Sequence, residues 1–167
     1  MKTKKRILPR AVPYVIQPLG PRDRERILHH LGSLNVGDRS LRFGVACDDE
    51  ALARYVAAID FESGSVLGAT WADGSLVGVA HIAFRDAVAE LGISVSPGRR
   101  QQGVAGALAA AALGEAQRMG AREFRFEAAA SNAGMHRLAR QLGMHVRAEG
   151  TDLLARRSLG ADPSVRI

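Results

Sequence analysis

The chain has 167 residues, 47% of them hydrophobic, and a formal net charge of +6. This length favours one domain, and we expect no membrane partner because no apolar run is long enough to span a bilayer. The single cysteine cannot form an internal disulfide, which favours a reducing, cytoplasmic location. Only 5% of the residues are aromatic and no nucleic-acid motif is present, so a specific nucleic-acid partner is not expected.

Part of the positive charge lies in the first twelve residues, ahead of any clear secondary-structure signal. We expect residues 1–12 to form a flexible basic tail, residues 13–160 to form one folded domain, and residues 161–167 to form a second tail. A basic surface attracts acidic partners, among them ligands that carry phosphate groups.

The hydrophobic periodicity and the turn residues predict an alternation of strands and helices. In chain order these are a strand over 14–17, a helix over 21–30, a loop over 33–43, a helix over 50–59, strands over 66–72, 76–84 and 88–95, a helix over 104–119, a strand over 122–128, a helix over 132–142 and a closing hairpin over 144–147 and 152–157. Asp73-Gly74 between two apolar runs is a strong hairpin signal. The order predicts an α/β domain with a mixed, mostly antiparallel twisted sheet flanked by helices.

Two polar segments in the first half of the chain have alternative interpretations. His29 and His30 are expected on the polar side of their helix, and no metal is predicted because no cysteine or acidic residue has ligand spacing with them. Residues 33–43 are rich in turn formers and indicate a loop. That loop either contacts a substrate or lies on the surface, anchored to the core by Leu41 and Phe43.

The central stretch of the chain joins a strand to a helix through a turn rich in glycine. The strand ends at Pro97-Gly98, and a run of good helix formers begins at Val104. Gly103 and Gly106 lack a Cβ, so the backbone can approach a ligand closely there. The unpaired N–H groups of the first helical turn and the helix dipole favour a bound phosphate. The stretch therefore predicts a phosphate cradle, and the alternative is a tight strand-to-helix connection without a ligand.

Neither standard nucleotide-binding loop fits this stretch. The Gly-Lys-Ser/Thr end of the P-loop is absent, and the glycine spacing is not Gly-x-Gly-x-x-Gly. The stretch resembles the acyl-CoA signature of the GNAT acetyltransferases, Arg/Gln-x-x-Gly-x-Gly/Ala, which residues 100–105 (Arg-Gln-Gln-Gly-Val-Ala) match. Val95-Ser96-Pro97 before the signature and Ala107-Leu108 after it agree with the family pattern.

A second resemblance to the GNAT family lies in the later helix. Asn132, Leu138, Gly143 and Met144 fall at the family spacing, although Met144 replaces the usual Phe. The resemblance implies the GNAT, or acyl-CoA N-acyltransferase, fold, with acetyl-CoA as co-substrate and no metal. It assigns acetyl-CoA binding to Ile93, Val95, Arg100, Gln101, Gln102, Gly103, Val104, Ala105, Gly106 and Asn132. By analogy the backbone N–H of Val95 holds the thioester carbonyl, whereas Asn132 could also be a helix N-cap, a role for which Ser131 competes.

Acetyl transfer to an amine needs a base for the nucleophile, a donor that polarises the thioester carbonyl, and stabilisation of the leaving thiolate. Pat-type protein lysine acetyltransferases, a bacterial branch of the family, carry a catalytic Glu in a setting similar to Ala89-Glu90. The resemblance nominates Glu90 as general base, directly or through water. The alternative is an outward-facing Glu90 on a half-exposed strand, and Glu62 and Glu127 are then the reserve carboxylates.

One position departs from the family pattern. Many GNAT enzymes place a Tyr seven residues after the Asn of the later helix, where it protonates the departing thiolate, and here that position is Ala139. His136 lies one turn along the same helix face from Asn132 and is the candidate substitute, although it could equally be a polar surface or core residue.

Three short segments favour the Pat-type branch. Residues 132–135 (Asn-Ala-Gly-Met) and 138–139 (Leu-Ala instead of Leu-Tyr) resemble its helix, and residues 40–43 resemble its Arg-Phe pair before a helix. The resemblance implies acetyl transfer from acetyl-CoA to a primary amine by direct attack, with a protein lysine as the favoured acceptor. The alternatives are acetylation of a small amine and a non-catalytic acyl-CoA sensor. We expect a monomer or a homodimer.

Overall fold

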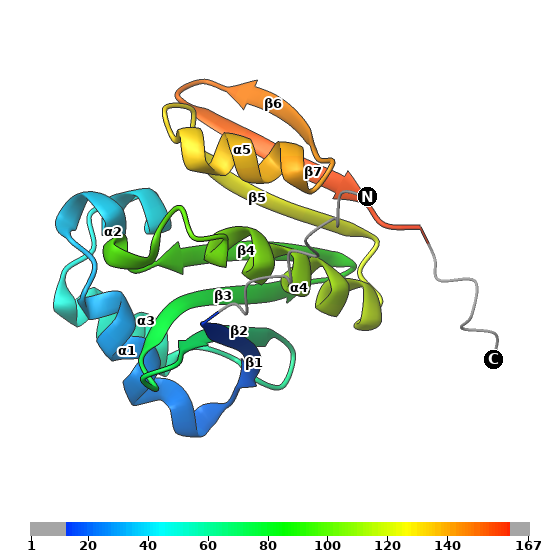
Figure 1. The fold of residues 1–167 in the computed structure, drawn as a ribbon. Coiled ribbons are helices and arrows are strands. Elements are labelled where there is room, and N and C mark those ends of the chain that lie inside the picture. Colours follow the sequence, from blue (N-terminus) through cyan, green and yellow to red (C-terminus); the bar gives the residue numbers. More distant parts are fainter. Residues whose placement is uncertain (1–12, 161–167) are drawn as a thin grey trace, which may run out of the picture.

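One twisted sheet runs through the whole domain (Figure 1). The computed structural model describes residues 13–160, so the tails predicted over 1–12 and 161–167 lie outside the described residues. Within that range the strands are β1 (Tyr14–Leu19), β2 (Ser65–Trp71), β3 (Leu76–Arg85), β4 (Val88–Val95), β5 (Glu123–Ala129), β6 (His145–Glu149) and β7 (Asp152–Ser158). The helices are α1 (Arg24–Gly32), α2 (Val36–Phe43), α3 (Asp49–Ala57), α4 (Val104–Arg118) and α5 (Ala133–Gln141), with 3₁₀ turns at Pro21–Asp23 (η1) and Pro97–Arg99 (η2). The predicted α/β class is confirmed.

The sheet contains a single parallel junction among the described residues, and it lies in the middle. The strand order is β1-β2-β3-β4-β5-β7-β6, and neighbours are antiparallel except for β4 and β5. These two strands pair only over Val88–Glu90 and Glu123–Arg125. Beyond those residues β4 and β5 separate, as Figure 1 shows, and leave one edge of β4 without a strand partner.

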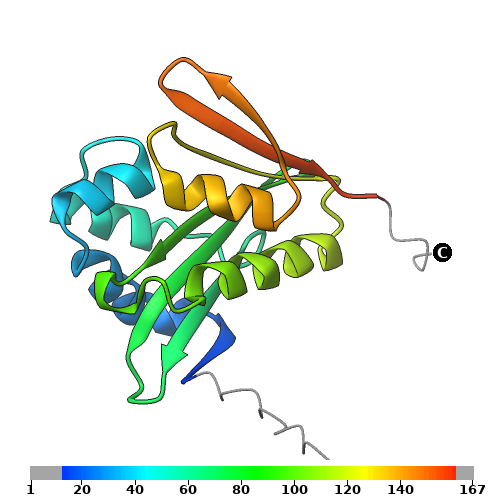
Figure 2. The same cartoon turned by 45° about the horizontal axis from the view of Figure 1, so that its top comes forward.

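Helices cover both faces of the sheet and bury two apolar clusters. On one face α4 packs across β2, β3 and β4, and the larger cluster there contains Leu108, Phe124 and Phe126. Figure 2 shows α5 beside α4 in front of the strands. On the other face α1 and α3 pack over a smaller cluster that includes Ile27 and Leu52. Burial of these side chains stabilises both layers, at roughly 1.5–3 kcal/mol for each large apolar side chain.

Residues 36–43 form helix α2, where the sequence pattern predicted a loop, so that prediction is wrong. Asn35 caps the helix, with its side-chain oxygen accepting a hydrogen bond from the backbone N–H of Asp38 at 2.8 Å. Gly44 ends the helix with a φ of 75°. Leu41 is 45% exposed and is no core anchor, whereas Phe43 packs against the smaller apolar cluster.

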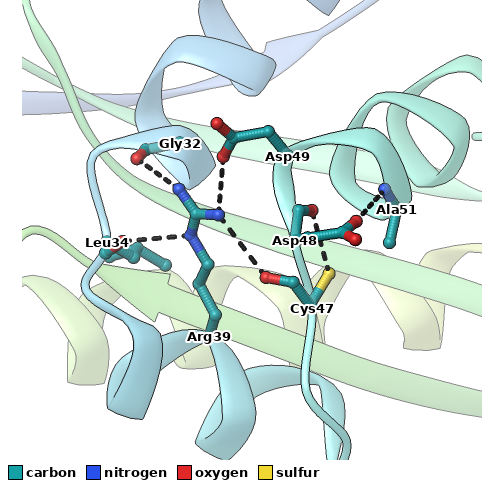
Figure 3. Close-up of polar contacts among 7 residues, drawn as sticks. All are labelled: Gly32, Leu34, Arg39, Cys47, Asp48, Asp49 and Ala51. Carbon is teal, nitrogen blue, oxygen red and sulfur yellow. Dashed lines mark hydrogen bonds and ion pairs between the residues drawn. The ribbon is translucent and has the colours of Figure 1, made fainter.

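Arg39 explains why a segment of weak helix formers is helical. Its guanidinium donates hydrogen bonds to the carbonyl oxygens of Leu34 at 3.0 Å, Gly32 at 2.7 Å and Cys47 at 3.4 Å (Figure 3). It also forms an ion pair with Asp49 of α3 at 2.7 Å. These contacts hold α2 between the end of α1 and the start of α3, and such tertiary contacts override intrinsic propensity.

His30 is buried, with 1% of its surface exposed, so its predicted place on the polar side of α1 is also wrong. His29 is exposed, as expected. The ring of His30 is buried because two hydroxyls of β4 and its following turn bind it: Nε2 lies 2.9 Å from Ser94 Oγ and Nδ1 lies 3.3 Å from Ser96 Oγ. Buried polar groups are tolerated where such partners exist.

Residues 13–160 lack two structural features, a membrane-spanning helix and a metal-binding cluster. In that part of the chain no helix combines the length and the apolar character that crossing a membrane requires. The same residues contain no group of three or more His, Cys, Asp and Glu side chains placed to hold a metal ion.

Candidate active site

A cleft of about 1130 Å³ opens where β4 and β5 separate. One wall is β4 with the turn into α4, the other is β5 with α5, and residues of α2 and α3 line it as well. All predicted site residues line it except Gln102 and His136: Glu90, Ile93, Val95, Arg100, Gln101, Gly103, Val104, Ala105, Gly106 and Asn132. Of the reserve carboxylates, Glu127 lines the cleft and Glu62 does not.

The open edge of β4 presents backbone donors to the cleft. Val95 lies opposite Gly78, and the N–H of Ser96 donates to the carbonyl of Val77 at 2.8 Å. Val95 and Gly78 therefore form a non-hydrogen-bonded pair of the antiparallel ladder. Because the ladder alternates, the N–H groups of Val95 and Ile93 point away from β3, into the gap that β5 has left. An extended ligand in this gap can accept hydrogen bonds from both.

The turn after β4 has the geometry of the predicted anion cradle at the start of α4. Gly103 is the N-cap residue and has a φ of 83°, a conformation that glycine adopts without strain. The first helical hydrogen bond runs from the N–H of Ala107 to the carbonyl of Gly103 at 3.0 Å. The N–H groups of Val104, Ala105 and Gly106 therefore have no helical acceptor, and the helix dipole adds partial positive charge. Such a terminus binds phosphate.

Two cradle residues hold the walls of the cleft together. The Nε of Arg100 donates to the carbonyl of Val95 at 3.1 Å, and its guanidinium forms an ion pair with Asp38 of α2 at 3.0 Å. The side chain of Arg100 thus ties the turn to β4 and to α2. A Cβ on Gly106 would lie 2.6 Å from Nε2 of Gln141, so glycine at this position lets α5 approach α4.

Glu90 stands at the vertex of the cleft. It is the last residue of β4 that pairs with β5, opposite Arg125, whose guanidinium forms an ion pair with its carboxylate at 3.1 Å. The side chain of Glu90 is 51% exposed. The Glu90 carboxylate thus lines the cleft, is oriented by a cation and is accessible to water.

The residues of the second predicted motif, on α5, lie in different surroundings: Asn132 lines the cleft and Ala139 lies in the protein interior. Asn132 caps α5, its side-chain oxygen accepting from the N–H of Met135 at 3.2 Å, so Asn132 rather than Ser131 is the N-cap. His136 does not line the cleft, and its Nε2 lies 2.8 Å from the carbonyl oxygen of Ala130. Ala139 is fully buried in the larger apolar cluster.

Three cleft residues that the sequence did not identify as a group form a hydrogen-bonded chain. Arg42 of α2 donates to the hydroxyl of Tyr55 of α3 at 2.9 Å, and that hydroxyl lies 2.6 Å from Nδ1 of His81 on β3. Burial lowers the pKa of His81 to about 4, and the positive charge of Arg42 acts in the same direction. The ring of His81 is therefore neutral at neutral pH. The Arg-Phe pair was the one local signal for this group.

His30 of α1 contacts strand β4 through the hydroxyl of Ser94, a residue that lines the cleft. Burial lowers the pKa of His30 to about 4, and the nearby charges of His29 and Arg42 act in the same direction. A neutral ring therefore holds the hydroxyls of Ser94 and Ser96, the residues on either side of Val95.

Comparison with known proteins decides the family. The model of the acetyltransferase (GNAT) family matches residues 28–144, which is more than half of the chain. The chain belongs to the GNAT family. The match confirms the resemblance seen in the signature and the later helix, and it makes this GNAT protein an N-acetyltransferase that uses acetyl-CoA as co-substrate.

Solved GNAT structures share its fold. The GNAT domain of S. lividans PAT is 20% identical, with a TM-score of 0.74 over 86% of this chain and 89% of that chain. Ribosomal-protein-alanine N-acetyltransferase from Brucella melitensis is 20% identical, with a TM-score of 0.67 over 87% of this chain and 99% of that chain. PaiA N-acetyltransferase from Thermoplasma acidophilum, solved with coenzyme A, is 17% identical, with a TM-score of 0.68 over 87% and 99%. No curated protein matches the sequence.

Proposed function

We propose that this GNAT enzyme acetylates a primary amine of a protein, with a lysine side chain as the favoured acceptor. The observation that carries the proposal is the cleft itself, where the anion cradle, the open edge of β4 and the Glu90 carboxylate lie together. Similarity to S. lividans PAT and to a ribosomal-protein-alanine N-acetyltransferase supports a protein amine. The cytoplasmic location and the monomer or homodimer state stay predictions.

In this proposal the chain holds acetyl-CoA through backbone groups. The free N–H groups of Val104, Ala105 and Gly106 bind the pyrophosphate, and Gln101 and Gln102 belong to the same turn. The arm of the cofactor lies along Ile93, and the N–H of Val95 donates to the thioester carbonyl. A preorganised donor at that oxygen stabilises the charge that develops during attack, an effect of about 3–4 kcal/mol in comparable sites.

The chemical step is a direct transfer. The amine nitrogen attacks the thioester carbon, a C–N bond forms and the C–S bond breaks, and Glu90 removes the proton from the nitrogen directly or through water. The leaving group departs as a thiolate and takes up a proton by equilibration with the solvent, to which Glu90 releases the proton it removed; an ordinary thiol, with a pKa of about 8.5, is mainly protonated at neutral pH. This route needs no proton donor at Ala139, nor one at His136.

Glu90→Gln tests the proposal, with acetyl-CoA affinity measured by calorimetry and acetylation measured on a lysine peptide. We expect turnover to fall about 10²–10⁴-fold while acetyl-CoA affinity stays within about twofold, because loss of a general base leaves donor binding intact. Glu62→Gln removes a carboxylate outside the cleft and is the matched control. Full activity of Glu90→Gln contradicts the assignment and directs attention to Glu127.

The choice of acceptor is tested in the same assay. Turnover of small amines in place of lysine peptides indicates a small-molecule enzyme. Acetyl-CoA binding without turnover of any amine indicates a non-catalytic sensor.

A further inference from the structure

A half-buried arginine without an acidic partner lines the cleft. Among residues 13–160 no carboxylate lies within ion-pair distance of Arg42. Of the other arginines that line the cleft, Arg100 is paired with Asp38, Arg137 is exposed, and Arg99 lies in the turn after β4 with its guanidinium over the ring of Trp71, away from β4 positions 90 and 92. Binding of an anion is more favourable in free energy at a partly desolvated cation without a counter-ion than at a fully solvated cation.

Arg42 lies on the same face of the sheet as the proposed base. Side chains alternate along a strand, so positions 90 and 92 of β4 face the same side, about 7 Å apart. Gly92 has no side chain, and the guanidinium of Arg42 fills the space above it. The guanidinium therefore lies two strand positions from Glu90, on the same face of the sheet. An acceptor with its amine at the Glu90 carboxylate can place a neighbouring group at this guanidinium.

The guanidinium is held in place before any ligand arrives. It donates to the hydroxyl of Tyr55 at 2.9 Å and stacks on the rings of Phe43 and Tyr55, with centroid distances of 4.7 and 5.6 Å. The hydroxyl of Tyr55 is fixed in turn by His81 at 2.6 Å. A planar, preorganised guanidinium binds a carboxylate with little further loss of side-chain entropy.

We propose that Arg42, positioned by Tyr55 and His81, forms an anion subsite that binds a carboxylate carried by the acceptor beside its reacting amine. The inference rests on the proposed function and specifies its substrate class. A protein lysine next to an acidic residue supplies this chemistry, and so does a free amino acid with its own carboxylate. The subsite selects between acceptors and takes no part in the bond changes at the thioester.

The test compares two lysine peptides that differ only in the residues flanking the lysine, glutamate in one and glutamine in the other. With the full chain and saturating acetyl-CoA, we expect kcat/KM to be at least about tenfold higher for the glutamate peptide, since charge-assisted hydrogen bonds are the strong ones. In Arg42→Gln the ratio should fall to about one. Arg42→Lys keeps the charge without the planar fork and should give an intermediate ratio.

Arg54→Gln is the matched control, because Arg54 is an exposed arginine of α3 outside the cleft and its loss changes the net charge equally. It should keep the wild-type ratio. A wild-type ratio of one, or a ratio that persists in Arg42→Gln, overturns the subsite. A large loss of acetyl-CoA affinity in Arg42→Gln also overturns it, because Arg42 then contacts the donor.

Failure of the proposed function gives a different result. If the wild type binds acetyl-CoA and acetylates neither peptide, a protein lysine is not its acceptor. The same comparison is then made with a free α-amino acid and its amide. Preference for the free acid that disappears in Arg42→Gln supports the subsite, and equal rates or turnover of neither compound overturn it.

Discussion

The guanidinium of Arg42 occupies the space in which a side chain at position 92 would begin. A Cβ placed on Gly92 overlaps the terminal nitrogens of Arg42, although the two residues are far apart in the sequence and come from α2 and β4. Arg42 can therefore occupy this position only because residue 92 is a glycine.

Gly92→Ala should displace Arg42 without unfolding the domain. The overlapping atoms are the flexible end of a side chain, and alanine fits an extended strand, so we expect the melting temperature to change by no more than about 4 °C. The preference for the glutamate peptide should fall towards one. Gly114→Ala on α4 is the control, since a Cβ there meets nothing within 4 Å. An unchanged peptide preference in Gly92→Ala would contradict this account of Arg42.

Substitutions of two glycines at opposite ends of α4 distinguish the effect of backbone strain from the effect of ligand contact. Gly103 and Gly120 both have a φ of 83°, but only Gly103 lines the cleft. We expect Gly103→Leu and Gly120→Leu each to lower the free energy of unfolding by about 1–2 kcal/mol, the cost of a left-handed non-glycine residue. Gly103→Leu alone should weaken acetyl-CoA at least about tenfold in a calorimetric titration. Equal affinities in the two variants would mean that the turn is not the cradle.

Arg39 should matter more for stability than its ionic partner. The side chain of Arg39 is 13% exposed and binds three backbone carbonyls, whereas Asp49 is 89% exposed (Figure 3). Arg39→Met leaves those carbonyls without a donor and should cost about 2–3 kcal/mol in urea unfolding. Asp49→Asn should cost less than about 1 kcal/mol, because exposed ion pairs contribute little. Similar costs for both variants would show that the ion pair, and not the carbonyl contacts, holds α2.

The stability of the domain should decrease as the pH falls from about 6.5 towards 4. Burial lowers the pKa of His30 to about 4, so between these values the unfolded chain binds a proton that the folded chain does not. This linkage removes about 2 kcal/mol between pH 7 and pH 5 for His30, and His81 acts in the same direction. Urea unfolding at the two pH values measures the loss. His30→Gln should show a smaller difference, and a wild type equally stable at both pH values would refute the prediction.

Local signals in the sequence were sufficient for most of the scaffold. Strand β4 has the predicted bounds, and the Asp73-Gly74 turn joins β2 to β3 as expected. The glycine signature placed the start of α4 and Asn132 placed the start of α5. Each of these features depends on hydrogen bonds and side-chain periodicity among near neighbours, which the order of residues determines directly.

Tertiary structure alone decided how the polar groups of the site are arranged. Helix α2 forms because Arg39 binds carbonyls beyond its own helix, and His30 is buried because Ser94 and Ser96, more than sixty residues later, satisfy its ring. The chain of Arg42, Tyr55 and His81 likewise joins three elements. A buried polar group is stable only where its partner lies in space, and partners distant in sequence leave no periodic pattern. The local sequence therefore determines the helices and strands of this GNAT protein. The selectivity that we propose for its cleft depends on how α2 and α3 pack against the sheet.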